Sequence, residues 1–268
     1  MDHLRRSLAP ISEEAWEAID TEARSTLRHY LAARPLIDFT GPLGWRQATV
    51  PLGRVSTAAG PVEGVSAGVR TSQPLVELRT PFTLSVSELD ALDRGAPDAD
   101  LDPLIEAARR SALAEDQAVF KGYEPGGITG IAPASPHDPL LISDDYDDYP
   151  GAVARAVARL RQSGVEGPYG IALGPRCYTG VIETTHHGGY PVFEHVKMIL
   201  GGPLIWAPAV DGAIVVSMRG GDFELVCGQD LSVGYLSHTA DEVHLYIEES
   251  LTFVVRDERA AIALRYER

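Results

Sequence analysis

The chain has 268 residues, of which 44% are apolar and 23% charged, and its net charge is −15. This length and apolar content suffice for one or two compact units with a buried core. The negative charge disfavours nucleic acid as a partner, because nucleic-acid binders normally present a basic surface. No apolar run approaches the roughly 20 residues that a membrane-spanning helix requires, so we expect no membrane partner.

The N-terminal segment and the two cysteines both indicate a cytoplasmic protein. No apolar stretch follows Arg5-Arg6, as it would in a secretory signal. Cys177 and Cys227 lie far apart and in no CxxC pattern, which favours free thiols over a disulfide or a zinc site.

The first predicted element is an amphipathic helix. Ser12 is suited to cap its N-terminus, and the two glutamates that follow complement the positive end of the helix dipole. Apolar side chains recur at helical spacing from Trp16 to Leu31, and Arg34-Pro35 is expected to end the helix. Its apolar stripe predicts packing against another surface, which is most often the chain's own core.

The segment from Gly41 to Pro81 has a different character. Glycines separate short β-rich pieces, and few apolar side chains are available for a core of its own. A long β-hairpin or extended arm therefore fits this segment better than a domain. Such an arm must lie on another surface, for which a neighbouring subunit is one candidate.

Two helices are expected next, from Ser87 to Leu92 and from Asp102 to Phe120. In the longer helix Asp102 is the expected cap, Pro103 occupies the first helical position, and Gly122 ends the element. This second helix has a continuous apolar face and would form the spine of a domain.

The remaining chain mixes both element types before it becomes β-rich. We expect a loop over 126–148, a helix over 150–160 and an alternating α/β unit over 169–206. Strands are expected from 213 onward, the longest over 243–255. Because late strands need partners, we predict that they pair with early elements in a domain built from both chain ends.

One motif has a catalytic interpretation. Gly64-Val65-Ser66-Ala67-Gly68 matches the G-x-S-x-G pattern of serine hydrolases, which acts only as a strand–turn–helix elbow that exposes the serine. The residues that follow lack helical periodicity, and Pro74 stands where the helix should continue. Glycines that shape an extended arm explain the pattern better, so we predict no catalytic residue and no enzymatic activity.

Two clusters could suggest a metal. The acidic run at 144–148 lacks the central glycine and the terminal glutamate of a calcium-binding loop. His186 and His187 are adjacent, which directs their side chains apart, and no zinc-type cysteine pair or phosphate-binding loop is present. We therefore predict no metal site.

Several stretches, taken in chain order, resemble the encapsulin shell proteins of family 1, which are also labelled linocin or bacteriocin-type proteins and are similar to tailed-phage capsids. These stretches are Leu8-Ala9-Pro10 with Trp16 and Ile19-Asp20, Gly41-Pro42-Leu43-Gly44-Trp45, Pro81-Phe82-Thr83-Leu84, Glu88-Leu89-Asp90, Glu115-Asp116 with Phe120-Lys121-Gly122, Gly164-Val165-Glu166-Gly167-Pro168-Tyr169, Gly189-Tyr190-Pro191, Arg219-Gly220-Gly221-Asp222-Phe223, Gly228-Gln229-Asp230-Leu231-Ser232-Val233-Gly234-Tyr235 and Glu249-Ser250-Leu251-Thr252-Phe253. They span nearly the whole chain.

The resemblance implies an α+β chain with the tailed-bacteriophage major capsid protein fold, which has a peripheral domain, an extended β arm (E-loop) and an axial domain. The expected ranges are the N-terminal helix and part of the peripheral domain at 1–44, the arm at 45–80, the peripheral domain with its spine helix at 81–132, the axial domain at 133–211, and C-terminal strands of the peripheral domain at 212–268.

The resemblance also implies a self-assembling shell subunit of an encapsulin nanocompartment, with about 60 copies in the smallest icosahedral shell. At −15 per copy, such a shell would carry roughly −900, which would repel a packaged genome. A cargo enzyme held by its C-terminal targeting peptide is the consistent alternative. Relatives suggest a dye-decolourising peroxidase or a ferritin-like protein.

Carried onto this sequence, two regions of the family become candidate sites. The cargo-peptide pocket falls on Leu27, Tyr30, Leu31, Arg34, Ile37, Asp38, Leu231, Val233 and Tyr235. The loop around the five-fold pore, which would admit small molecules, falls on Glu183, Thr184, Thr185, His186, His187, Gly188 and Gly189. Histidines repeated around a ring could change the charge of the pore between about pH 5 and 7, or they could simply be solvated loop residues.

The sequence departs from the family at one position. Some members stack a flavin on a tryptophan beside the Glu-Leu-Asp helix start, where this chain has Ser87. Serine offers no aromatic face, so we expect no flavin and no other cofactor.

Two other functions remain as alternatives. A hydrolase or bacteriocin-type enzyme would need a nucleophile with its base, or a toxin-like amphipathic segment, and neither is present. A phage-derived capsid protein that packages DNA is disfavoured by the charge and by the lack of a long N-terminal scaffolding segment.

Overall fold

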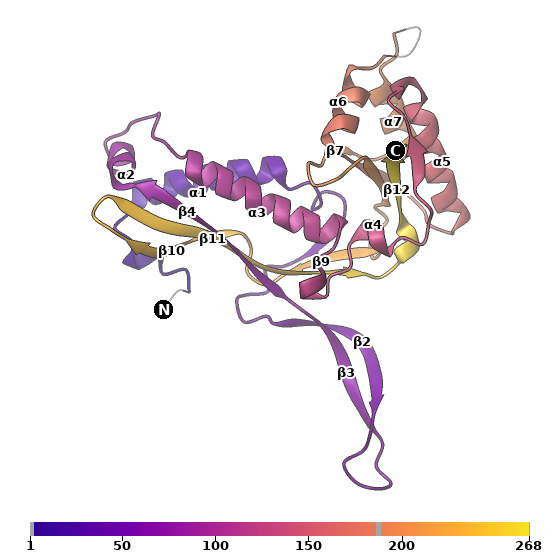
Figure 1. The fold of residues 1–268 in the computed structure, drawn as a ribbon, viewed down its shortest axis with the longest axis horizontal. Coiled ribbons are helices and arrows are strands. Elements are labelled where there is room, and N and C mark those ends of the chain that lie inside the picture. The colour runs from indigo at the N-terminus through magenta and orange to yellow at the C-terminus, as the bar shows by residue number, and fades with distance from the viewer. Residues whose placement is uncertain (1–2, 186–188, 268) are drawn as a thin grey trace.

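The computed structural model describes residues 3–185 and 189–267 and contains two sheet-based units, from which a long hairpin projects (Figure 1). Strand β11 organises the first sheet: it pairs antiparallel with β4 along one side and with β10 and then β9 along the other, while β1 pairs parallel with β9. The strands of this sheet are β1 (Asp38–Thr40), β4 (Val76–Ser85), β9 (Phe223–Cys227), β10 (Ser232–His238) and β11 (Glu242–Val255).

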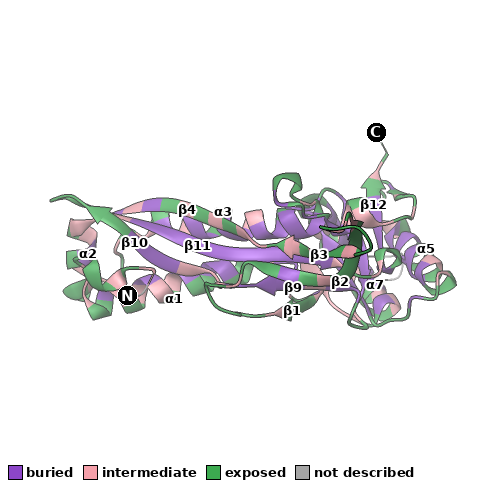
Figure 2. Cartoon of the chain, turned by 90° about the horizontal axis from the view of Figure 1, so that it is seen from below, coloured by how far each residue is buried: buried purple, intermediate pink, exposed green. Residues whose placement is uncertain are grey.

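Helices cover one face of the first sheet. Helix α1 packs against α3, and α3 lies on β4 and β11. Figure 2 shows the buried residues concentrated on β11 and on the inner faces of the helices. Leu27 of α1, Leu104 of α3 and Leu245 of β11 belong to this core. The helical elements are η1 (Arg6–Leu8), α1 (Glu13–Tyr30), α2 (Val86–Asp93) and α3 (Asp102–Phe120).

The second sheet has the strand order β5-β12-β8-β6-β7, and α5 and α7 pack against each other beside it (Figure 1). All five residues of β6 and of β8 are buried, as expected for central strands covered on both faces. The elements are α4 (Ile131–Ala134), β5 (Leu140–Ile142), α5 (Tyr149–Gln162), β6 (Tyr169–Leu173), α6 (Pro175–Glu183), α7 (Val192–Leu200), β7 (Leu204–Trp206), β8 (Ala213–Ser217), β12 (Ala261–Tyr266), η2 (Glu124–Gly126), η3 (Tyr146–Asp148) and η4 (Glu258–Ala260).

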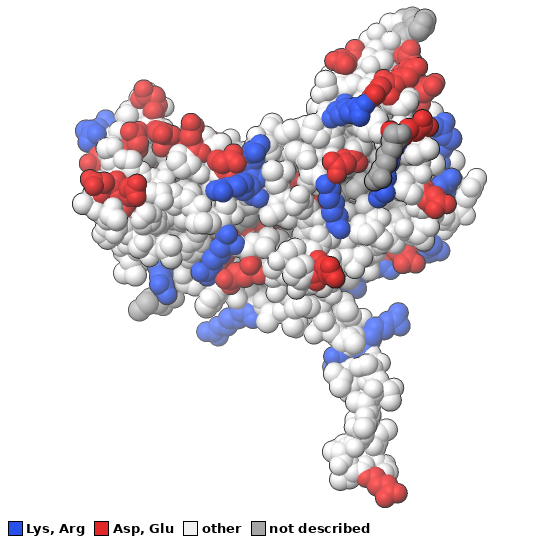
Figure 3. Space-filling view, in the orientation of Figure 1, with Lys and Arg blue, Asp and Glu red and all other residues white. Residues whose placement is uncertain are grey.

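The arm expected from the sequence is a hairpin of β2 (Thr49–Ala58) and β3 (Ala67–Pro74), which together form a two-stranded sheet. Its apolar side chains are unusually open: Val55, Val62 and Val69 are 66%, 63% and 59% exposed. On the face in Figure 3, few charged side chains lie along the distal part of the hairpin. A mainly uncharged, projecting hairpin of this kind is suited to burial against another protein surface.

Most predicted elements form, but the range 126–148, expected as a loop, contains α4 and β5, and the ends of two helices also differ. Ser12 caps α1 as predicted, because its Oγ accepts a hydrogen bond from Ala15 N–H at 3.0 Å. The helix ends at Tyr30, before the expected Pro35. The prediction that Asp102 caps α3 is wrong: Leu101 occupies the N-cap position and makes no side-chain cap hydrogen bond.

The strand pairing agrees with the expected ranges in one respect and differs from them in two. Late strands do pair with early elements, since β9 pairs with β1 and β11 with β4. Strand β4 begins at Val76, within the range expected for the arm. The range 212–268 contributes to both sheets, because β8 and β12 pair with each other and β8 pairs with β6.

Candidate peptide-binding groove beside the first helix

A groove of about 420 Å³ runs between α1, η1 and β10. Its two walls are tied together at one point, where Tyr235 N–H of β10 donates to the Leu4 carbonyl at 2.8 Å. The residues that line it are Leu4, Arg6, Asp20, Ala23, Arg24, Leu27, Arg28, Leu31, Arg34, Asp230, Leu231, Ser232, Val233 and Ile247.

The groove has an apolar floor and a charged rim. Leu27, Val233 and Ile247 are nearly buried by the core beneath them, while Leu31 and Leu231 are only partly covered. Partly covered leucines next to a fixed apolar floor can gain further burial from a ligand, at about 25 cal/mol for each Å² removed from water. An extended segment with apolar side chains matches this surface.

The structure divides the nine residues expected for the cargo-peptide pocket into two groups. Five of them line the groove together: Leu27, Leu31, Arg34, Leu231 and Val233.

The other four lie outside its lining. Tyr30 faces the Trp206 ring at 5.6 Å, and the Tyr235 hydroxyl contacts His238 Nδ1 at 2.5 Å. Ile37 and Asp38 line a separate hollow of about 130 Å³, where Asp38 Oδ2 accepts a hydrogen bond from Gly221 N–H at 2.6 Å.

Sequence reasoning missed several lining residues. Ala23, Arg24 and Arg28 share a face of α1 with Leu27 and Leu31, because positions three and four apart are neighbours on a helix. Helical spacing alone could therefore have identified them. The contributions of Leu4, Arg6 and Ile247 come from other elements, and no local pattern indicates them.

Arg34 anchors a charge cluster at one end of the groove. Its Nη2 donates to Glu115 at 2.6 Å, to Asp230 at 2.8 Å and to Glu249 at 3.0 Å, and its Nε donates to Glu115 at 2.9 Å. Burial opposes the charged form, but the hydrogen bonds and charges of Glu115 and Asp230 raise the pKa of the guanidinium above its usual value. Arg34 stays a cation at any pH at which the protein is folded.

The carboxyl groups around Arg34 outnumber its charge. Glu115 and Glu249 are almost completely buried. Burial, together with the neighbouring Glu115 charge, raises the pKa of Glu249 well above its ordinary value. Burial likewise raises the pKa of Asp116 to about 7, although the backbone N–H groups of Ala32 and Ala33 donate to it and oppose the shift. A proton is therefore held in this cluster near neutral pH.

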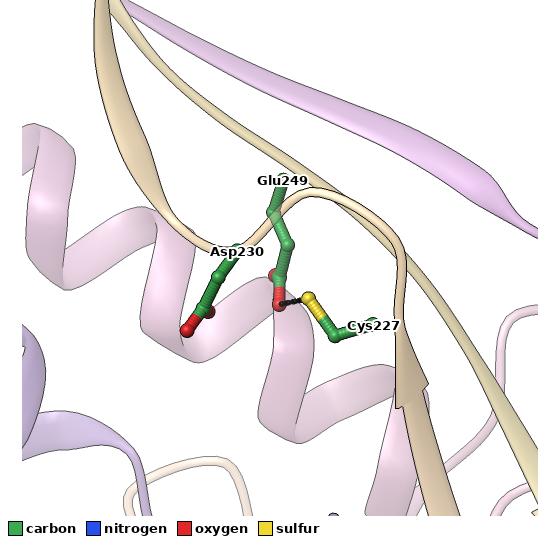
Figure 4. A group of neighbouring side chains, drawn as sticks. All are labelled: Cys227, Asp230 and Glu249. Atoms are coloured by element: carbon green, nitrogen blue, oxygen red, sulfur yellow. Dashed lines mark hydrogen bonds between the residues drawn. The ribbon is translucent and has the colours of Figure 1, made fainter. Parts of the chain in front are cut away.

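Cys227, Asp230 and Glu249 converge on the same region, as Figure 4 shows. Glu249 Oε1 lies 4.0 Å from Cys227 Sγ. Burial and the nearby Glu249 raise the pKa of the Cys227 thiol, which disfavours the thiolate that metals bind. Arg34 contacts both Asp230 and Glu249 and supplies the positive charge between them, so the arrangement works as an ion-paired cluster.

The expected pore loop follows α6. Glu183 is the last residue of that helix, the Thr184 carbonyl accepts a hydrogen bond from Val192 N–H at 3.1 Å, and Thr185 forms an isolated antiparallel bridge with Pro191. These contacts close the neck of the loop, and Gly189 has a left-handed φ of 82°. His186, His187 and Gly188 lie outside the described residues.

Other sequence candidates fall in separate places. Ser66 lies in the turn of the β2–β3 hairpin and not at a strand-to-helix elbow. In the acidic run, Asp144 pairs with Arg176. Ser87 is in the first turn of α2, and its Oγ contacts the Ser85 Oγ at 2.7 Å.

Comparison with known proteins identifies the family. Residues 1–252 match the family described as "Encapsulating protein for peroxidase". A type 1 encapsulin shell protein of Rhodospirillum rubrum is 54% identical over 271 residues, covering 99% of this chain and 97% of the relative. The type 1 encapsulin shell protein of Mycobacterium tuberculosis is 43% identical over 266 residues, covering 99% of this chain and all of the relative.

Solved structures show the same fold at low sequence identity. A virus-like particle from Pyrococcus furiosus has a TM-score of 0.68 at 16% identity, covering 94% of this chain and 100% of that one. A Mycobacterium phage Bobi protein has a TM-score of 0.59 at 15% identity, covering 89% and 91%.

Among the described helices, none is long and apolar enough to cross a membrane. The two sheets and the projecting hairpin together have the fold of these capsid-type particles. The chain belongs to the encapsulin shell protein family and has the tailed-bacteriophage major capsid fold.

Proposed function

We propose that about 60 copies of this chain assemble into a closed icosahedral compartment that encloses a cargo enzyme. The cargo enzyme is captured when its C-terminal tail binds in the groove between α1 and β10. The shell serves as a container and not as a catalyst, which agrees with relatives that are named shell proteins.

The groove is the observation that carries the cargo part of this proposal. It combines partly covered leucines, Leu31 and Leu231, with a floor held in place by the core of the first sheet. A preformed apolar groove can bind an extended tail without reorganising, which lowers the entropic cost of docking. Even if each tail binds weakly, a multimeric cargo presents several tails at once, and together they hold it firmly.

The family description and one relative support an enzyme as the cargo. The family description names a peroxidase as the protein that is encapsulated. A diheme-cytochrome-encapsulin shell fusion protein of Kuenenia stuttgartiensis is 24% identical over 243 residues, and in that protein a cytochrome is part of the same chain as the shell. We propose a dye-decolourising peroxidase as the cargo here, with a ferritin-like protein as the alternative.

The same proposal covers the loop at 183–189 and the location of the shell. The loop lines a pore that admits small molecules to the cargo, and the compartment resides in the cytoplasm. Nucleic acid is not the content, because about 60 copies with a charge of −15 each would repel it.

Assembly is tested first, by expressing the chain alone and measuring particle mass by light scattering after size exclusion. About 60 chains of 28.8 kDa predict a single species of about 1.7 MDa. A folded monomer or small oligomer would contradict the shell.

Cargo docking is tested by co-expressing the chain with a fluorescent protein that carries the C-terminal tail of the candidate peroxidase. Leu31→Asp places a charge in the apolar groove and should abolish loading, while Leu31→Met keeps the side chain apolar and should load normally. Intact Leu31→Asp shells that load as wild type does would refute the groove as the docking site.

A further inference from the structure

The groove carries more basic than acidic side chains, whereas the whole chain has a net negative charge. The whole protein has 38 acidic and 23 basic residues. The charged residues that line the groove, in contrast, are four arginines and two aspartates: Arg6, Arg24, Arg28, Arg34, Asp20 and Asp230.

Two of these arginines already have acidic partners within the chain. Arg6 donates to Asp20 at 2.8 Å and lies over the Trp16 ring at 4.0 Å. Arg34 is held by Asp230 and by the buried glutamates beneath it. Both aspartates of the groove are therefore engaged, and these two arginines offer little net charge to a ligand.

Arg24 and Arg28 remain. Both are exposed on α1, and among the described residues neither forms an ion pair or a hydrogen bond through its side chain. They stand four residues apart, so their like charges repel across one helical turn. Arg28 lies in the last turn of α1, where a cation stabilises the helix dipole. That effect is confined to the final turn and does not account for Arg24.

Building on the proposed cargo function, we infer that Arg24 and Arg28 bind a carboxylate of the docked tail. The tail is then an apolar segment with an aspartate or glutamate, or its own C-terminal carboxylate, beside the leucines that enter the groove. A guanidinium matches a carboxylate with paired hydrogen bonds. A bound carboxylate also relieves the repulsion between the two arginines.

The test measures loading of a monomeric fluorescent protein co-expressed with the full chain, since a monomer removes the masking effect of avidity. Its synthetic tail contains two leucines among glycine and serine, with an aspartate or an asparagine next to the leucines. A Gly-Ser extension beyond the leucines moves the terminal carboxylate away and separates the two possible sources of charge. The readout is fluorophore per shell protein in purified particles.

One shell variant is Arg24→Gln/Arg28→Gln. The control is Arg155→Gln, which removes a single arginine charge at an exposed position of α5, outside the groove. We expect the aspartate tail to load about three- to tenfold better than the asparagine tail into wild-type shells at limiting expression, as two exposed ion pairs would give. The double variant should lose this preference, and Arg155→Gln should retain it.

A charge reversal provides a second, positive readout. Shells with Arg24→Glu/Arg28→Glu should reject the aspartate tail and accept a tail with lysine in its place. If loading changes only when the Gly-Ser extension moves the C-terminus of the tail, the arginines bind the terminal carboxylate. This result also supports the inference.

The outcomes separate the two proposals. If loading requires the leucines but does not change with the aspartate, the position of the terminal carboxylate or the two arginines, the inference is overturned. The groove then remains a docking site. Failure of every tail to load would refute docking in the groove itself. A fall in co-purified nucleic acid in the double variant, with unchanged tail loading, would assign the arginines to phosphate and overturn the inference.

Discussion

The Arg34 guanidinium and the Glu115 carboxylate form a two-point contact, with Nε and Nη2 donating at 2.9 and 2.6 Å. This contact joins the segment after α1 to the middle of α3. Glu115 is fully buried, whereas Arg34 reaches the groove surface with a side chain that is 20% exposed. One residue thus belongs both to the packing around α3 and to the wall of the groove.

Replacing Arg34 by leucine should destabilise the subunit by about 3–5 kcal/mol, because it leaves buried carboxylates without their cation. The measurement is the guanidinium unfolding midpoint followed by circular dichroism. Arg256→Leu is the matched control: Arg256 pairs with Glu224 at the surface, where removal should cost less than about 1 kcal/mol. Equal effects of the two substitutions would contradict a special role for the buried cluster.

Stability should fall as the pH rises from about 4 to about 7, because the raised pKa of Asp116 lies near 7 in the folded protein and near 3.8 in the unfolded chain. Between these values the unfolded chain loses a proton that the folded state retains, so the free energy of unfolding decreases. The full difference corresponds to at most about 4 kcal/mol.

Asp116→Asn should flatten this pH dependence while leaving one oxygen to accept from the backbone of Ala33. Glu249, whose pKa is also raised, contributes in the same direction and should leave a residual slope. Unfolding midpoints measured from pH 4 to 8 for both proteins test the assignment. Parallel curves would show that Asp116 does not titrate in this range.

Ser12→Ala should lower the stability by about 0.5–2 kcal/mol, because it removes the oxygen that caps the Ala15 N–H of α1. Ser12 also donates to Asp93, the last residue of α2, so the loss falls toward the upper part of that range. Ser25→Ala, at an exposed position inside the same helix, should be neutral or slightly stabilising, since alanine is the better helix former. Thermal unfolding compares the two.

Aspartates in place of Val62 and Val69 should block assembly without unfolding the subunit. Both side chains are exposed on the hairpin, and the hairpin strands pair with each other. The added charges should therefore leave the fold of the subunit intact and destabilise only a contact in which a neighbouring copy covers this surface. Isoleucines at the same positions keep the surface apolar and should assemble. Full-sized particles from the aspartate variant would show that the arm surface is not buried between copies.

The sequence by itself determined the local elements. Ser12 specifies the start of α1 through a hydrogen bond three residues away, and the sparse apolar content of the arm segment predicts a hairpin without a core. Family resemblance then predicted the fold and five of the fourteen residues that line the groove, including Leu31 and Leu231. These features depend on helical or strand periodicity, or on motifs, and both can be read along the chain.

Only the tertiary structure decided which distant residues meet. Arg34 contacts side chains 81, 196 and 215 positions away, and β8 and β12 join the second sheet although the strands between them in sequence, β9 to β11, join the first. No spacing rule encodes such pairings. They follow from burying every apolar face and from the need of each buried charge and strand edge for a partner, and the whole chain must satisfy these demands at once.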